Sequence, residues 1–143
     1  MINLFVLKNL IILYTGEIKN IMDQKIIYIF FESGFSLDIA KMCQLDNINQ
    51  KNFPTSRKMI SQIKKQEPDY IITEFIYSPS LGTQISGLDG IFGAVERFCQ
   101  NTKLIVYTEN RFRQHLETVR EKYTIHYVLE YPVIQEDLRS IFK

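Results

Sequence analysis

The sequence predicts one α/β domain built around a five-stranded parallel sheet, and two observations lead to this prediction. From residue 25 onward, short apolar runs alternate with segments in which apolar residues recur every three or four positions, as is typical of βαβ units. The chain has 143 residues, of which 45% are hydrophobic. This length suits one domain with a single substantial core.

Four of the five predicted strands are short apolar runs, whereas the second is a short segment in a polar, poorly patterned stretch. Each predicted helix follows a turn or a capping residue. Residues 25–31 are almost continuously apolar, which is typical of a strand covered on both faces. Thr55 or Ser56, after Pro54, is expected to cap a helix. The five predicted strands are residues 25–31, 47–49, 70–75, 103–108 and 125–130. The five predicted helices are residues 36–44, 55–66, 91–99, 110–123 and 134–142.

Residues 77–89 form a long predicted loop that is rich in Ser, Pro and Gly. Long ordered loops at the ligand edge of a sheet often carry binding, so this loop is a candidate binding element. The helix after it is expected to turn four residues toward the core. These are Ile91, Val95, Phe98 and Cys99.

Composition and charge exclude several classes of function. Basic and acidic residues are balanced at 17 and 16, and no basic stripe stands out, so we expect no nucleic-acid partner. Cys43 and Cys99 are far apart, and neither they nor His115 and His126 have metal-ligand spacing. We therefore expect reduced, packed cysteines, no metal and no cofactor. The lack of a disulfide framework favours a cytoplasmic protein.

Residues 1–21 are expected to lie outside the domain, which we place at residues 22–143. Lys8 and Asn9 interrupt the apolar N-terminal stretch, and it is shorter than the roughly 20 residues of a membrane-spanning helix, so no membrane partner is expected. Two interpretations stay open: an upstream extension or mis-called start, or an added amphipathic helix. In the second interpretation, one side of that helix carries Leu4, Leu7, Leu10 and Ile11.

Three segments in the second half of the chain carry a family resemblance. "PDYIITEFIYSP" (residues 68–79) looks like "PDLIITDxxMP", and "GLDG" (residues 87–90) looks like the "GMDG" that follows it. "KLIVYTE" (residues 103–109) and "YVLEYP" (residues 127–132) look like "PVIVLTA" and "FLEKP". In order and spacing they resemble the receiver domain of bacterial response regulators, over residues 24–143. The resemblance implies a flavodoxin-like (CheY-like) three-layer sandwich with strand order 2-1-3-4-5.

The resemblance also implies a phosphotransfer chemistry, from which this sequence departs. In that family an aspartate accepts a phosphoryl group beside a Mg²⁺ ion that two acidic residues hold. The phosphoacceptor position here is Glu74, which is one methylene longer and displaces the nucleophilic oxygen. The acidic pair falls on Phe30 and Phe31, with Glu32 one place beyond. Phenyl rings do not coordinate Mg²⁺, which prefers oxygen ligands.

The remaining positions of the implied site match only in part. The family's lysine falls on Tyr131, or on Glu130 if the turn is shifted by one, and neither supplies the cation that balances phosphoryl charge. Only Thr108 agrees with the family's threonine or serine. Without metal and lysine a phosphorylated carboxylate has little electrostatic support. We therefore predict that phosphotransfer is lost and that the protein is not an enzyme.

Two interpretations of Glu74 stay open. It is a solvated carboxylate at the end of a strand, or it permanently mimics the phosphorylated acid and holds Thr108 inward. Thr108 in turn has a second interpretation as an ordinary β-branched strand residue. Phe30 and Phe31 are expected to fill the space where a metal and its water would sit.

The function predicted from these residues is that of a stand-alone pseudo-receiver, a phosphorylation-independent protein-interaction module in bacterial signalling whose partner is another protein or a second copy. Aromatic residues gather in the part of the chain that forms the output face in receivers, and Tyr is common at interface hot spots. The candidate interface residues are Phe112, Tyr123, Tyr127, Tyr131 and Phe142. The alternative is a small-ligand module that uses the crevice at the strand ends. A third hypothesis is an atypical receiver that still works through Glu74.

Overall fold

The fold is a five-stranded parallel sheet between two layers of helices. The computed structural model describes residues 3–22, 24–33, 36–45, 47–77 and 88–143. The strand order is β2-β1-β3-β4-β5, which confirms the predicted sheet and its topology. The strands are β1 (Lys25–Phe30), β2 (Ile48–Asn52), β3 (Tyr70–Phe75), β4 (Lys103–Thr108) and β5 (Tyr127–Glu130).

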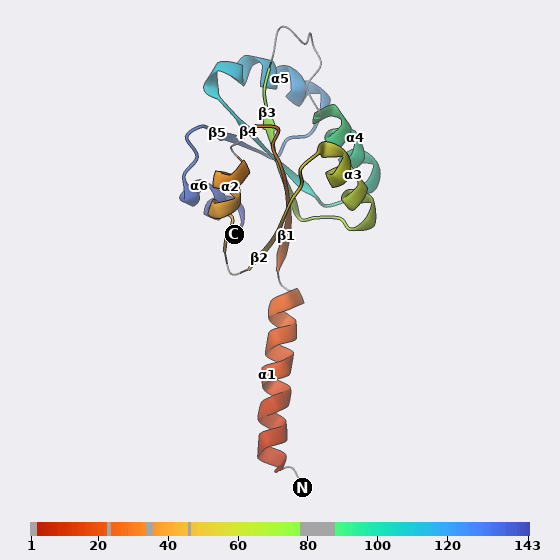
Figure 1. The fold of residues 1–143 in the computed structure, drawn as a ribbon, viewed down its shortest axis with the longest axis vertical. Coiled ribbons are helices and arrows are strands. Elements are labelled where there is room, and N and C mark those ends of the chain that lie inside the picture. The colour runs from red at the N-terminus through yellow and green to blue at the C-terminus, as the bar shows by residue number, and fades with distance from the viewer. Residues whose placement is uncertain (1–2, 23, 34–35, 46, 78–87) are drawn as a thin grey trace.

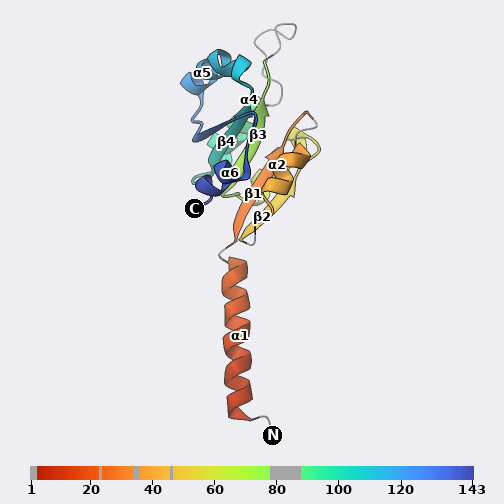
Figure 2. The same ribbon diagram turned by 90° about the vertical axis from the view of Figure 1, so that its left-hand side faces the viewer.

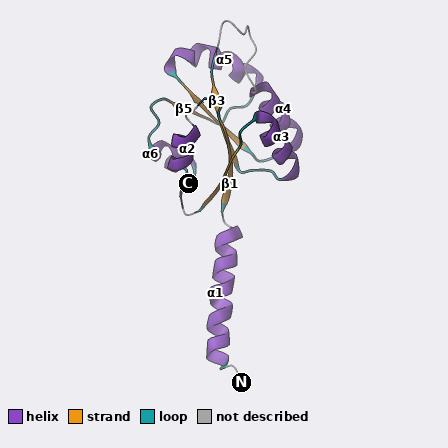
Figure 3. Ribbon diagram, in the orientation of Figure 1, coloured by secondary structure: helices purple, strands orange, loops and turns teal. Residues whose placement is uncertain are grey.

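Helices cover both faces of the sheet, as Figures 1 and 3 show. One face carries three helices and the other carries two, so the central strands β1, β3 and β4 are buried on both sides. The first face is covered by α3 (Ser56–Lys65), α4 (Leu88–Phe98) and α5 (Arg113–Lys122). The second is covered by α2 (Ser36–Met42) and α6 (Gln135–Ile141). A short 3-10 turn, η2 (Asn110–Phe112), leads into α5.

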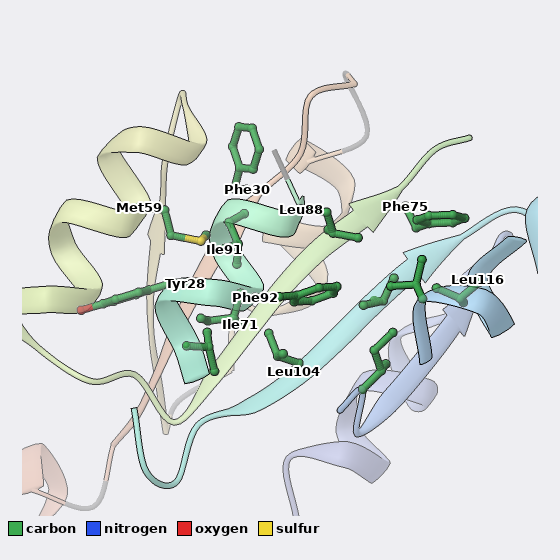
Figure 4. Close-up of a cluster of buried hydrophobic side chains, with 14 of the residues drawn as sticks. Tyr28, Phe30, Met59, Ile71, Phe75, Leu88, Ile91, Phe92, Leu104 and Leu116 are labelled. Carbon is green, nitrogen blue, oxygen red and sulfur yellow. The ribbon is translucent and has the colours of Figure 1, made fainter. Parts of the chain in front are cut away.

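Two hydrophobic clusters, one on each face, form the core. The cluster under α3, α4 and α5 contains Phe30, Met59 and Leu88, and Figure 4 shows these side chains on the same side of the sheet. The cluster under α2 and α6 contains Phe31, which directly follows Phe30, the last residue of β1. Successive residues of a strand face opposite sides, so the two phenylalanines enter different clusters. Burying each such side chain contributes about 1.5–3 kcal/mol.

The amino ends of three strands are joined by one residue, Asp69. The carboxylate of Asp69 accepts a hydrogen bond from the amide of Ile26 at 2.8 Å. The backbone of Asp69 also bonds both neighbours, because its N–H donates to Ile26 and its carbonyl accepts from Lys103. This fixes the register of β1, β3 and β4, and it therefore sets which residues meet at the opposite, carboxyl edge.

The predicted elements agree with the structure at β3 and β4 and differ at several ends. The second strand is longer than expected, because Ile48–Asn52 pairs in parallel with β1 over five residues. The α4 helix begins at Leu88, so the last residues of the predicted loop are helical. Thr55 caps α3 by accepting a hydrogen bond from the amide of Lys58, as expected. The rest of the predicted loop, residues 78–87, lies outside the described residues.

The expectation that Phe98 faces the core is wrong. Its side chain is 43% exposed at the end of α4. The cations of Lys64 and Arg97 lie 5.4 Å and 6.0 Å from its ring centroid, and such pairs stabilise an aromatic face outside the core. The helical period allowed position 98 to join the inner face, but the helix ends there.

Replacing Gly93 with alanine is expected to stabilise the protein by about 1 kcal/mol, because glycine is a poor residue inside a helix. A methyl group built at Gly93 meets no heavy atom within 4 Å, so the substitution introduces no clash. Gly90→Ala is the matched control, since its methyl would lie 3.3 Å from Ile60 Cδ1 and would gain less. Urea unfolding of the two variants measures both effects. Equal gains would contradict the prediction.

The N-terminal segment forms a helix, α1 (Leu4–Met22), that extends away from the sheet in both views (Figures 1 and 2). Every described side chain from residue 3 to residue 15 is exposed. The helix of the second interpretation is present over Leu4–Met22, and its side chains in residues 3–15 do not pack on the sheet domain. The domain boundary at residue 22 stays a prediction. No helix in the described chain is long and apolar enough to cross a membrane.

Candidate functional site

The candidate site lies at the carboxyl edge of the sheet, where β1, β3 and β4 end. Glu74 pairs in register with Tyr107 of β4, and Phe31 directly follows β1 on the other side of β3. In open parallel α/β sheets this edge is where ligands and chemistry gather. The sheet thus brings Phe31, Glu74 and Tyr107 together, although they are far apart in the sequence.

Glu74 is not a solvated carboxylate, because only 8% of the residue is exposed. Both of its oxygens accept hydrogen bonds from Ser33, which lies in the turn after β1. The amide N of Ser33 is 2.5 Å from Oε1, and the Ser33 hydroxyl donates to Oε2. Hydrogen bonds to a charged acceptor are stronger than neutral ones, so this contact secures the carboxylate. The first interpretation of Glu74, as a solvated group, is therefore wrong.

Two aromatic residues that contact each other lie at the same edge of the sheet as Glu74. The rings of Phe31 and Tyr107 have centroids 5.4 Å apart and are tilted by 34°. Burial, together with smaller contributions from nearby groups that include Glu74 and Asp38, raises the pKa of Tyr107 to about 12. The tyrosine is therefore neutral at physiological pH and adds no charge beside Glu74.

The positions of the family's acidic pair are occupied by core side chains. Phe30 and Phe31 are 6% and 7% exposed and belong to opposite core clusters. Glu32, the next residue, is exposed. Among the described residues, no group of three His, Cys, Asp or Glu side chains gathers where a metal ion would bind. As expected, the two phenylalanines fill the core; the expectation of no metal stays a prediction.

Thr108 is buried but does not contact Glu74. Its Oγ1 is 3.4 Å from the carbonyl oxygen of Phe75 and 3.3 Å from that of Glu109. Along β4 the side chains of Tyr107 and Thr108 point to opposite faces, so Thr108 lies on the other side of the sheet from Glu74. No contact between Glu74 and Thr108 therefore supports the interpretation that Glu74 holds Thr108 inward. The carboxylate instead accepts hydrogen bonds from Ser33.

The position of the family's lysine carries no cation in this chain. Tyr131 follows β5 and is 58% exposed. Glu130 forms an ion pair with Arg113 of α5, with Nη2 and Oε1 separated by 2.5 Å, so it is turned toward that helix. Arg113 neutralises Glu130 and not the group at Glu74.

Little room for a small ligand exists beside Tyr131 and Tyr107. The described cavity there has a volume of about 80 Å³ and is also lined by Asp38 and Ile39. Ligand pockets usually measure about 300–1,000 Å³. This cavity, in the described part of the chain, is therefore smaller than a usual ligand pocket, and the small-ligand hypothesis stays a prediction.

A larger groove runs along the free edge of β5, between α5 and α6. Its volume is about 780 Å³. Charged side chains of α5 line one wall, and Arg120 pairs with Glu117 there at 3.4 Å. Residues of α6, among them Ser140, line the other wall. The described part of β5 has no strand partner on this side, so its backbone groups face the groove.

The structure divides the five candidate interface residues into two groups. Phe112 and Phe142 are buried: Phe112 packs edge-to-face on Phe75, and Phe142 on Tyr70. Their assignment to an interface is wrong, because each completes a core cluster at a helix end. Tyr123, Tyr127 and Tyr131 remain partly or fully exposed, and Tyr127 lines the groove.

Sequence reasoning did not identify Ser33 and Tyr107 as site residues. Ser33 comes shortly after the first predicted strand, residues 25–31, and Tyr107 lies within the fourth, residues 103–108. A signal existed only for Ser33, since a hydroxyl residue directly after a strand lies at the edge where Glu74 was expected.

Comparison with solved structures finds the same fold in receiver domains. The signal receiver domain of a putative LuxO repressor protein from Vibrio parahaemolyticus is 18% identical, with a TM-score of 0.63 over 83% of this chain and 87% of that one. A CheY-like receiver domain protein from Methanospirillum hungatei is 13% identical, with a TM-score of 0.63 over 83% of this chain and 90% of that one. These likenesses establish the CheY-like fold, as predicted.

A longer protein also contains this fold. The response regulator RcsB, solved in complex with DNA, is 19% identical and has a TM-score of 0.62 over 83% of this chain and 58% of its own. The chain therefore spans a little over half of that protein. No family model matches the chain, and no curated protein matches its sequence.

Proposed function

We propose that this protein is a receiver-like domain that has lost phosphotransfer and acts as a phosphorylation-independent protein-interaction module in bacterial signal transduction, in the cytoplasm. The observation that carries the proposal is the contact between Ser33 and Glu74. Both oxygens of the carboxylate at the phosphoacceptor position accept hydrogen bonds from one residue of the chain. A nucleophile that is bound in this way is not presented to an incoming phosphoryl group.

The surroundings of Glu74 support the same conclusion. Phosphoryl transfer depends on positioning and on cations that neutralise the developing charge. Phe31 and Tyr107, at the same edge of the sheet as Glu74, carry aromatic rings and supply neither. A partner would therefore recognise one constant conformation of the site, with no signal required.

The groove along β5 is the surface we assign to a protein partner. An extended segment can add to the free edge of a sheet through backbone hydrogen bonds, while pockets beside it select side chains. The edge of β5 and the two flanking helices have this form. Surface ion pairs such as Arg120–Glu117 line it and provide polar contacts.

A backbone amide NMR titration with Mg²⁺ and beryllium fluoride, a phosphoryl mimic, tests the loss of phosphotransfer. We expect no shift at Ser33, Glu74 or Thr108, because the carboxylate is held and the metal positions are phenylalanines. Saturable shifts at these three amides would mean that the site still works, and the proposal would be wrong.

A pull-down experiment tests the interaction with a protein partner. The full chain serves as bait in bacterial extract, with and without Mg²⁺ and beryllium fluoride, and we expect the same captured protein in both. Arg120→Glu, on the groove, should abolish capture. Arg139→Glu is the matched control, because Arg139 forms a similar pair with Glu136 on α6 but does not line the groove. Equal loss in both variants would contradict the groove assignment.

A further inference from the structure

The α1 helix exposes large apolar side chains along most of its described length. Nine such residues lie in residues 4–14, and every one is at least 44% exposed. Monomeric soluble proteins rarely expose contiguous apolar surface of this extent without an interaction that covers it. They are Leu4, Phe5, Val6, Leu7, Leu10, Ile11, Ile12, Leu13 and Tyr14.

These side chains surround the helix. Residues 4–7 and residues 10–13 are two runs of four consecutive apolar residues. Successive helical residues are about 100° apart, so four in a row point in all directions around the axis. A helix that is apolar on all sides needs an apolar environment on all sides.

A second copy of α1 would cover only part of this surface. A two-stranded coiled coil buries positions a and d of a heptad, and residues 4, 7, 11 and 14 have that spacing. Val6 and Leu13 lie well away from such a seam, with 48% and 68% of their surface exposed. Pairing of two helices would leave them in water.

The length and the ends of the apolar segment indicate lipid. Eleven residues span about 16 Å, roughly half of the 30 Å hydrocarbon core of a bilayer. This agrees with the finding that no described helix can cross a membrane. Tyr14 ends the segment, and tyrosine favours the level of lipid headgroups. The long stem of Lys8, within the segment, allows its charge to reach the polar surface.

We propose that residues 4–14 of α1 insert into one leaflet of a lipid membrane and hold the α/β domain at its surface. The expectation of no membrane partner was based on the length needed to span a bilayer, and that limit does not apply to insertion into one leaflet. The inference is independent of the function proposed for Glu74 and the β5 groove.

Flotation of the full chain with phosphatidylcholine–phosphatidylglycerol vesicles tests the proposal. We expect the wild type to float with the vesicles. Ile11→Glu and Leu13→Glu lie on opposite sides of the helix. Each should lower the partition coefficient about tenfold or more, because each removes an apolar side chain that the bilayer would bury. Thr15→Glu, just beyond Tyr14, adds the same charge outside the segment and should change it little.

The same variants distinguish lipid from a second copy. If α1 pairs with itself, the wild type is an oligomer in lipid-free sedimentation, Ile11→Glu dissociates it, and Leu13→Glu has no effect. That pattern would overturn the proposal. It would also be overturned if the wild type did not float with the vesicles. Circular dichroism and unfolding of the domain check that each variant remains folded.

Discussion

Replacing Phe31 with aspartate is expected to lower the free energy of unfolding by about 4 kcal/mol or more. Removing a buried phenyl ring alone costs about 3–5 kcal/mol, and Phe31 is 7% exposed. The new carboxylate would also lie beside Glu74 without a cation, and a like charge nearby is unfavourable. Urea unfolding of the wild type and the variant measures the difference.

Phe31→Leu is the matched control for this substitution. It keeps an apolar side chain in the cluster with Tyr107 and should cost only about 1–1.5 kcal/mol. If Phe31→Asp were as mild as Phe31→Leu, the pocket would be open to water and ions. That result would weaken the argument that phenylalanine has replaced the metal-binding acids.

The fold was predictable because its signals are local. The central strands are short apolar runs, so β3 and β4 were located from the sequence alone, whereas the polar β2 was not fully located. Phe98 shows the limit of this reasoning. The helical period that correctly places Ile91 in the core also places position 98 on the same side. The helix ends at Phe98, however, and its exposed ring is covered by Lys64 and Arg97 outside the core.

The candidate site was predictable only in part, because its contacts join distant residues. The resemblance pointed to Glu74, Phe30 and Phe31, because the residue type at a single position can be read from the sequence. The hydrogen bonds from Ser33 connect residues 41 apart in the chain, and no periodicity signals such a pair. The roles of Phe112 and Phe142 were missed for a similar reason, since their ring partners, Phe75 and Tyr70, come from other elements.

The α1 helix was difficult to interpret from the sequence for the same reason, because local signals do not show contacts between distant residues. Its helical period was visible in the sequence, but whether its apolar residues face a core depends on the path of the chain. The structure places that helix away from both core clusters, so its described apolar side chains are not covered by the domain.

Removing the Ser33 hydroxyl is expected to destabilise the protein by about 2–3 kcal/mol, because a buried carboxylate loses a donor that water cannot readily replace. Ser33→Ala keeps the backbone N–H bond to Oε1, so the loss is confined to the hydroxyl bond to Oε2. Urea unfolding at neutral pH measures the change.

A double-mutant cycle isolates the contact from other effects of the substitutions. In a Glu74→Gln background the side chain is neutral and its amide can donate to other acceptors, so Ser33→Ala should cost about 1 kcal/mol or less there. A coupling energy of about 1–2 kcal/mol is therefore expected between Ser33 and Glu74. A coupling near zero would mean that the serine does not hold the carboxylate in solution. In that case Glu74 would be free to meet a phosphoryl donor, and the main support for a phosphorylation-independent module would be lost.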